Sequence, residues 1–156
     1  MLPTLPDRLG VLADVRPDLP LAVSELVDFL PLQVGKPLQK WLKRQSGGEV
    51  LLLLAGTDAD IAIEAIEYLR FRIGNTSTRL ICFASGDALG RLQLLVCSHD
   101  IQRLQSMRDF NDSFLLRLLE AETSIYRHQN DLRGSREREI ELMTWLARLS
   151  RKSLFE

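Results

Sequence analysis

The middle of the chain has the clearest pattern of hydrophobic and polar positions. The apolar run 49–55 follows two glycines and has the length of a buried strand. Residues 58–73 then repeat apolar side chains at three- and four-residue intervals, which predicts an amphipathic helix. A second apolar run, 79–84, predicts another strand. A strand, a helix and a strand at this spacing indicate a parallel crossover.

The segment 85–97 fits two structures. Residues 85–90 can cap a helix, or they can form the loop of a hairpin whose second strand is 91–97. We favour the hairpin, because both flanks begin with Arg-Leu and continue with mostly apolar residues, and because Gly90 would weaken a helix. A loop this short permits only an antiparallel return.

The N-terminal segment 1–48 contains all six prolines. Proline fixes φ and lacks a backbone donor, so we expect neither a long helix nor a central strand in this arm. Its apolar spacing predicts two short helices instead, one within 21–30 and one at 37–45.

From His99 onward the pattern is helical, with apolar side chains in steps of three and four. Asn111 and His128 interrupt this stripe. Each either sets the register of a helix pair or marks where the stripe turns toward solvent. Gly134 and Ser135 break the pattern before a last helix at 136–152, so the short connection predicts an antiparallel helical hairpin.

Together these elements predict one α+β domain over residues 1–156. A small mixed sheet of about three strands, with one βαβ crossover, would occupy 49–97. The helical arm 1–48 and the long C-terminal helical hairpin 98–156 would cover its two faces.

Composition removes several classes of function. The formal net charge of −1 favours neither nucleic acid nor an anionic membrane as a general partner. The longest apolar run, 50–55, is far shorter than the ~20 residues that span a bilayer. The N-terminus lacks the basic and then apolar regions of a secretory signal, so we expect a cytoplasmic protein.

Asp58 and Asp60 follow the strand 49–55 and begin a helix, a place where α/β proteins often bind ligands. The two carboxylates could hold a divalent cation, although capping the helix and complementing its dipole explains them more simply. Receiver-like domains also carry acids near such a turn. This sequence predicts too few strands for that fold and has no acid at the end of 79–84. We therefore expect no metal and no cofactor.

Residues 97–100 bring thiol, hydroxyl, imidazole and carboxylate together in the sequence Cys-Ser-His-Asp. A nucleophile and a base that are adjacent in sequence seldom point at one another. Cys97, like Cys82, lies in an apolar run and is expected to be a small buried hydrophobe, with Ser98 as a helix N-cap. We predict no catalytic residue here.

Four basic residues, Lys36, Lys40, Lys43 and Arg44, share one face of the predicted helix 37–45 beside Trp41. Such a face can grip the phosphates of nucleic acid or of anionic lipid in a salt-dependent way. In a chain with a slight acidic excess it is more commonly a solvated face, so we expect nucleic acid not to be the partner.

The last helix has apolar residues more than halfway round it between 140 and 149. A terminal helix needs one apolar stripe to dock, so the wider girdle indicates a second contact, either with a partner or with another element of its own domain. The sequence therefore predicts a protein–protein interaction module, such as an adaptor, regulatory or small assembly subunit, that binds partners or itself. Two alternatives are an enzyme or switch at Asp58/Asp60 or Cys97/His99, and a nucleic-acid-associated subunit at residues 36–44. The predicted interface residues are Phe114, Leu118, Ile125, Ile140, Met143, Trp145 and Leu149.

Overall fold

A computed structural model describes residues 5–44 and 48–155 of the chain. The chain divides into two compact units, Met1–Thr123 and Ser124–Glu156, and each is described by itself. No helix among the described residues is both long enough and apolar enough to cross a bilayer.

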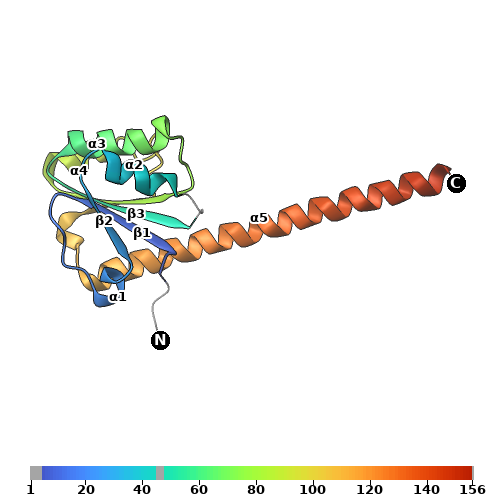
Figure 1. The fold of residues 1–156 in the computed structure, drawn as a ribbon, viewed down its shortest axis with the longest axis horizontal. Helices are drawn as coiled ribbons and strands as arrows, with labels where there is room; N and C mark the ends of the chain where they lie inside the picture. Colours follow the sequence, from blue (N-terminus) through green and yellow to red (C-terminus); the bar gives the residue numbers. More distant parts are fainter. Residues whose placement is uncertain (1–4, 45–47, 156) are drawn as a thin grey trace. The chain divides into compact units, whose positions relative to one another are not determined.

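The first unit alternates strands with helices along the chain, as the colours of Figure 1 show. The strands are β1 Arg8–Ala13, β2 Val27–Pro31, β3 Glu49–Gly56, β4 Arg79–Ala84 and β5 Arg103–Ser106. The helices are α1 Leu21–Ser24, α2 Lys36–Lys43, α3 Ala59–Glu67 with its π-helical continuation η1 Tyr68–Arg72, α4 Gly86–Gln93, the 3-10 turn η2 Met107–Asp109 and α5 Asp112–Phe155.

The five strands form one sheet in the order β2-β1-β3-β4-β5, and every pair is parallel. This is the strand order of a doubly wound α/β sheet. The prediction of an α+β fold with a mixed sheet of about three strands is therefore wrong. The predicted shortage of strands for a receiver-like fold is wrong as well, because the sheet has five.

The missing strands come largely from the proline-rich segment. β1 is a central strand, and its Leu9 pairs with Val27 on one side and Val50 on the other. The prolines lie around the strands: Pro31 ends the edge strand β2, and Pro37 lies in the first turn of α2, where its missing N–H is not needed. The predicted helix within 21–30 is wrong beyond its first turn, because β2 begins at Val27.

The predicted hairpin at 85–97 is also wrong, because residues 86–93 form α4. Ala88 and Leu92 are four residues apart and both are fully buried against the sheet. That burial outweighs the cost of about 1 kcal/mol for Gly90 inside a helix. β5 follows at Arg103–Ser106. The prediction that the chain is helical from His99 onward is therefore wrong.

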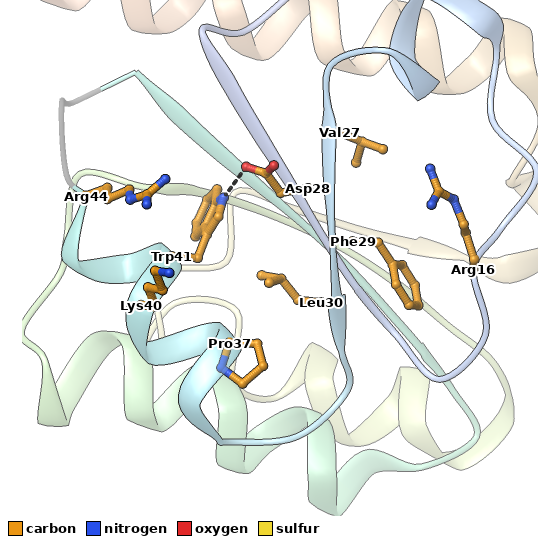
Figure 2. A pocket seen from close by; sticks show the side chains of 9 residues that line it. All are labelled: Arg16, Val27, Asp28, Phe29, Leu30, Pro37, Lys40, Trp41 and Arg44. Atoms are coloured by element: carbon orange, nitrogen blue, oxygen red, sulfur yellow. Dashed lines mark hydrogen bonds between the residues drawn. The ribbon is translucent and has the colours of Figure 1, made fainter.

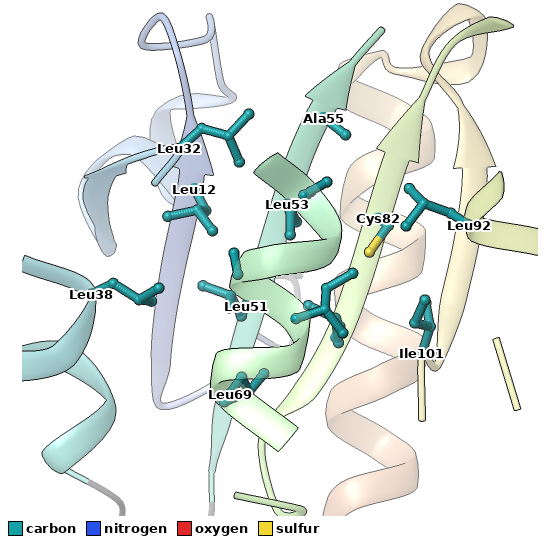
Figure 3. Packing of buried hydrophobic residues seen from close by; sticks show 14 of the residues in the cluster. Leu12, Leu32, Leu38, Leu51, Leu53, Ala55, Leu69, Cys82, Leu92 and Ile101 are labelled. Carbon is teal, nitrogen blue, oxygen red and sulfur yellow. The ribbon is translucent and has the colours of Figure 1, made fainter. Parts of the chain in front are cut away.

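Helices cover both faces of the sheet. Helices α2, α3 and α4 pack on one face, where Leu12, Leu53, Cys82 and Leu92 belong to the core cluster shown in Figure 3. The other face buries Leu9, Val11, Leu52 and Phe83 against α1 and against Leu115 and Leu119 from the start of α5. Because side chains of central strands are buried on both faces, these strands read as continuous apolar runs.

α5 is one continuous helix, so the predicted C-terminal helical hairpin is wrong. The backbone remains helical through Gly134 and Ser135. A single glycine costs about 1 kcal/mol in a helix interior and does not by itself end the helix. Asn111 lies just before α5 and its Oδ1 accepts from the backbone N–H of Phe114 at 3.0 Å, which makes it a cap and not a residue of a helix seam.

Candidate functional site

The carboxyl ends of β1 and β3 border a cleft of about 450 Å³. Strand order reverses between these two strands, and doubly wound sheets commonly bind ligands at this point. We call this the switch-point cleft; its lining residues are Ala13, Asp14, Val15, Pro17, Leu54, Ala55, Gly56, Thr57, Asp58, Met107 and Phe110.

The acidic residues predicted near this cleft stabilise helices. Asp58 caps α3, as predicted, because its Oδ1 accepts from the N–H of Ile61 at 3.2 Å. Asp60 is exposed and pairs with Arg91 of α4 at 2.8 Å. Within the described ranges 5–44 and 48–155, no group of three or more His, Cys, Asp or Glu residues is placed to hold a metal ion.

Residues 97–100 lie in the segment that joins α4 to β5. The hydroxyl of Ser98 is 2.8 Å from Nδ1 of His99, although the two residues are adjacent in sequence. Nε2 of His99 is 3.3 Å from Oε1 of Glu67, which comes from α3. The sequence pointed to Ser98 and His99 but missed Glu67, because the contact joins residues 32 positions apart and has no local signal.

The same groups also hold the turn in place. The Ser98 hydroxyl has one proton, and Oγ lies 3.4 Å from the carbonyl oxygen of Leu95, which can accept it. The His99 ring packs edge-on against Phe71, with 5.0 Å between ring centroids. These contacts fix the turn between α4 and β5, so they have a structural explanation without catalysis.

Cys97 differs from its prediction, because it is exposed and Cys82 is the buried thiol. Ser98 does not cap a helix either, since the next helical residues begin only after β5. Complete burial raises the pKa of Cys82 from 9.0 to about 12, because desolvation disfavours the thiolate.

We expect the two thiols to react with a thiol reagent at very different rates at pH 8. Cys97 should be labelled in the native protein, while Cys82 should react at least about a hundredfold more slowly until the fold is opened with urea. Mass spectrometry of the labelled peptides measures both rates, and Cys97→Ser provides the control. Rapid labelling of Cys82 in the native Cys97→Ser variant would contradict its burial in the core.

The four residues of the predicted basic face of α2 do not all line the same cleft. Lys36, Lys40, Lys43 and Arg44 are all exposed. A second cleft, of about 540 Å³, lies beside β2. Of the four basic residues, Lys40 and Arg44 line it and the other two do not. We call this cleft the β2 groove; its lining residues are Arg16, Val27, Asp28, Phe29, Leu30, Pro37, Lys40, Trp41 and Arg44 (Figure 2).

Trp41 forms an inner wall of the β2 groove and is 5% exposed. Its Nε1–H donates to Oδ2 of Asp28 at 3.0 Å, and the guanidinium of Arg8 lies 4.6 Å from the centre of its ring. Arg8 also donates to the carbonyl oxygens of Trp41, at 3.0 Å, and of Arg44, so the end of α2 is tied to β1.

The predicted interface residues fall in different environments. Phe114 packs in the core of the first unit, with its ring 6.4 Å from that of Phe83, and Leu118 is buried in the same cluster. Ile125 is half-buried. Within the second unit, Ile140, Met143 and Trp145 are exposed, and the side chain of Leu149 lies outside the described ones.

Fold alone does not assign an activity here, since doubly wound sheets support many functions. The chemistry available is a mostly apolar cleft whose lining includes Asp14 and Asp58, a structural Ser98–His99 pair and a basic groove beside β2. Comparisons with protein-family models, with curated proteins and with solved structures found no match to the chain.

Proposed function

We propose that the protein is a cytoplasmic protein–protein interaction module, an adaptor or regulatory subunit, that associates with a second copy of itself through the part of α5 beyond Thr123. The observation that supports this is the exposure of large apolar side chains in the second unit. Trp145 is 57% exposed and Met143 is 68% exposed, and Ile140, Leu142 and Leu146 accompany them.

An isolated helix with these side chains in water has little to stabilise it. Helices in proteins gain most of their stability by packing an apolar face, and isolated ones are marginal. Leu142, Trp145 and Leu146 are related by three- and four-residue steps, so they lie on one side of the helix. Ile140 and Met143 form a neighbouring stripe.

A second copy is the simplest partner for this surface. Two identical helices in parallel place the same apolar residues opposite one another, as in coiled-coil dimers. Charged residues such as Glu141 and Arg148 adjoin the apolar stripes, where they would remain in water.

We expect Trp145→Ala to weaken self-association by about 2 kcal/mol, or roughly thirtyfold in the dissociation constant, because large aromatic residues dominate interface energies. Sedimentation equilibrium over a concentration series measures this. Leu94→Ala is the matched control, since Leu94 is an 84% exposed apolar side chain outside the second unit. A wild-type chain that stays monomeric at high micromolar concentration would contradict the proposal, as would equal effects of the two substitutions.

A further inference from the structure

The β2 groove runs along an edge of the sheet. In the described part of the chain, β2 pairs with β1 alone, so its outer side has no neighbouring strand. The unpaired N–H and C=O groups of an edge strand are a template for another extended segment. Prolines and charged residues protect natural edge strands from such pairing. In β2 these residues are Pro31 and Asp28, which shorten the available edge without removing it.

Side chains of the groove lie on both sides of β2, as Figure 2 shows. Val27 and Phe29 point to one side, together with Arg16. Asp28 and Leu30 point to the other side, where Lys40, Trp41 and Arg44 of the α2 segment lie. An extended segment laid along β2 also directs its side chains alternately to the two sides. Each side would therefore meet apolar surface and at least one cation.

The charge of the groove selects the ligand. Three cations, Arg16, Lys40 and Arg44, line it against one carboxylate, that of Asp28. Asp28 already accepts the indole N–H of Trp41 at 3.0 Å. The surplus is positive on a chain whose net charge is −1, so the groove is a local site for anions.

We propose that the β2 groove binds an extended acidic peptide segment of a partner protein by strand addition to β2. Main-chain hydrogen bonds to the free edge supply affinity, and acidic side chains facing Arg16 and Lys40/Arg44 supply specificity. This site uses none of the residues of α5 proposed for self-association and does not depend on it.

A peptide fits these observations better than a nucleic acid does. Cations lie on both sides of a strand edge, which matches the alternating side chains of an extended peptide. A nucleic-acid strand would track one continuous basic surface, but Lys36 and Lys43 of the same helix do not line the groove.

The test uses the full-length protein and three labelled eight-residue probes. The first repeats Asp-Asp-Val-Val, so that an extended chain directs acidic and apolar side chains to both of its sides. The second has Asn in place of every Asp, and the third is the Asp peptide with all of its backbone amides N-methylated. Fluorescence anisotropy measures binding at 50 and 200 mM salt. We expect saturable binding of the Asp peptide that weakens at the higher salt concentration, and at least about tenfold weaker binding of the other two probes.

Matched protein variants locate the site. Arg16→Gln/Lys40→Gln/Arg44→Gln should weaken binding of the Asp peptide by at least about tenfold, whereas Lys36→Gln/Lys43→Gln, on the same helix, should change it less than about twofold. Circular dichroism melts confirm that both variants fold; all of these side chains are exposed or partly exposed. Trp145→Ala should bind the peptide like the wild type, whether or not the wild-type chain self-associates.

Several results would overturn the proposal. One is the absence of saturable binding by the Asp peptide, and another is equal binding of the N-methylated probe, which would show a charge effect without strand addition. Equal loss of binding in the two basic-residue variants would place the contact outside the groove. A last such result concerns competition with a twelve-nucleotide oligothymidylate. If it displaces the labelled peptide at a lower concentration than unlabelled peptide does, the cations bind nucleic acid instead.

Discussion

Replacing Arg70 by methionine is expected to lower the free energy of unfolding by about 3 kcal/mol or more. The Arg70 side chain is buried, and burial lowers its pKa, an effect that the nearby carboxylate of Asp100 opposes. Its guanidinium donates to the carbonyl oxygens of Asn75 at 3.1 Å, His99 at 3.2 Å and Asp100 at 2.8 Å. Methionine fills a similar volume but leaves these acceptors without a partner, and each buried unpaired acceptor costs about 1–3 kcal/mol.

Urea unfolding followed by tryptophan fluorescence measures the loss. Arg72→Met is the matched control, because Arg72 lies two residues away and is exposed, and its effect should stay within about 0.5 kcal/mol. Asp100 has φ of 53°, a region that non-glycine residues rarely adopt, and the bonds from Arg70 hold the turn there. Similar unfolding curves for the two variants would show that the turn is held by other contacts.

Trp41→Ala is the second substitution with a large expected effect, a loss of about 3–5 kcal/mol of folding stability. The indole is buried in the core cluster between the sheet and helices α2, α3 and α4, donates to Asp28 and lies beneath the guanidinium of Arg8. Trp145→Ala is the matched control, because its indole is exposed, and it should leave the free energy of unfolding at low protein concentration nearly unchanged.

Gly10 provides an independent check on the packing of Trp41. A Cβ added at Gly10 would lie 2.9 Å from two ring carbons of Trp41 and 3.1 Å from Leu51. Gly10→Ala should therefore cost about 1–3 kcal/mol in the wild-type chain and clearly less in the Trp41→Ala background. Additive effects in this double-mutant cycle would contradict the close approach of the ring to β1.

The strands that the sequence predicted correctly are those whose burial leaves a continuous apolar run. β3 and β4 are such strands, and the helix between them and the Asp58 cap were also confirmed. β1 is also largely apolar, although Gly10 interrupts its run, and the surrounding prolines led to the prediction of no central strand there. Proline disfavours a central strand only where it lies inside that strand, and none of the six lies within Arg8–Ala13.

Other elements depend on contacts that no local pattern encodes. β5 has the sequence Arg-Leu-Gln-Ser, and its residues are half-buried at an edge of the sheet, so it shows no apolar run. Glu67 meets His99 only because α3 and the turn after α4 lie together in the fold. The β2 groove joins Arg16 to Lys40 and Arg44, whereas the sequence grouped Lys40 and Arg44 with Lys36 and Lys43 by helical spacing alone.

The central position of β1 has a consequence for synthesis on the ribosome. β1 is made before β2 and β3, yet it requires β2 on one side and β3 on the other, and its pairing with β3 joins residues 41 positions apart. Parallel pairing permits no hairpin as a local nucleus, so such sheets form late and slowly. A nascent chain that has not yet reached Gly56 therefore exposes an apolar strand that has not met all its neighbours, and this is the stage at which chaperone binding or aggregation competes with folding.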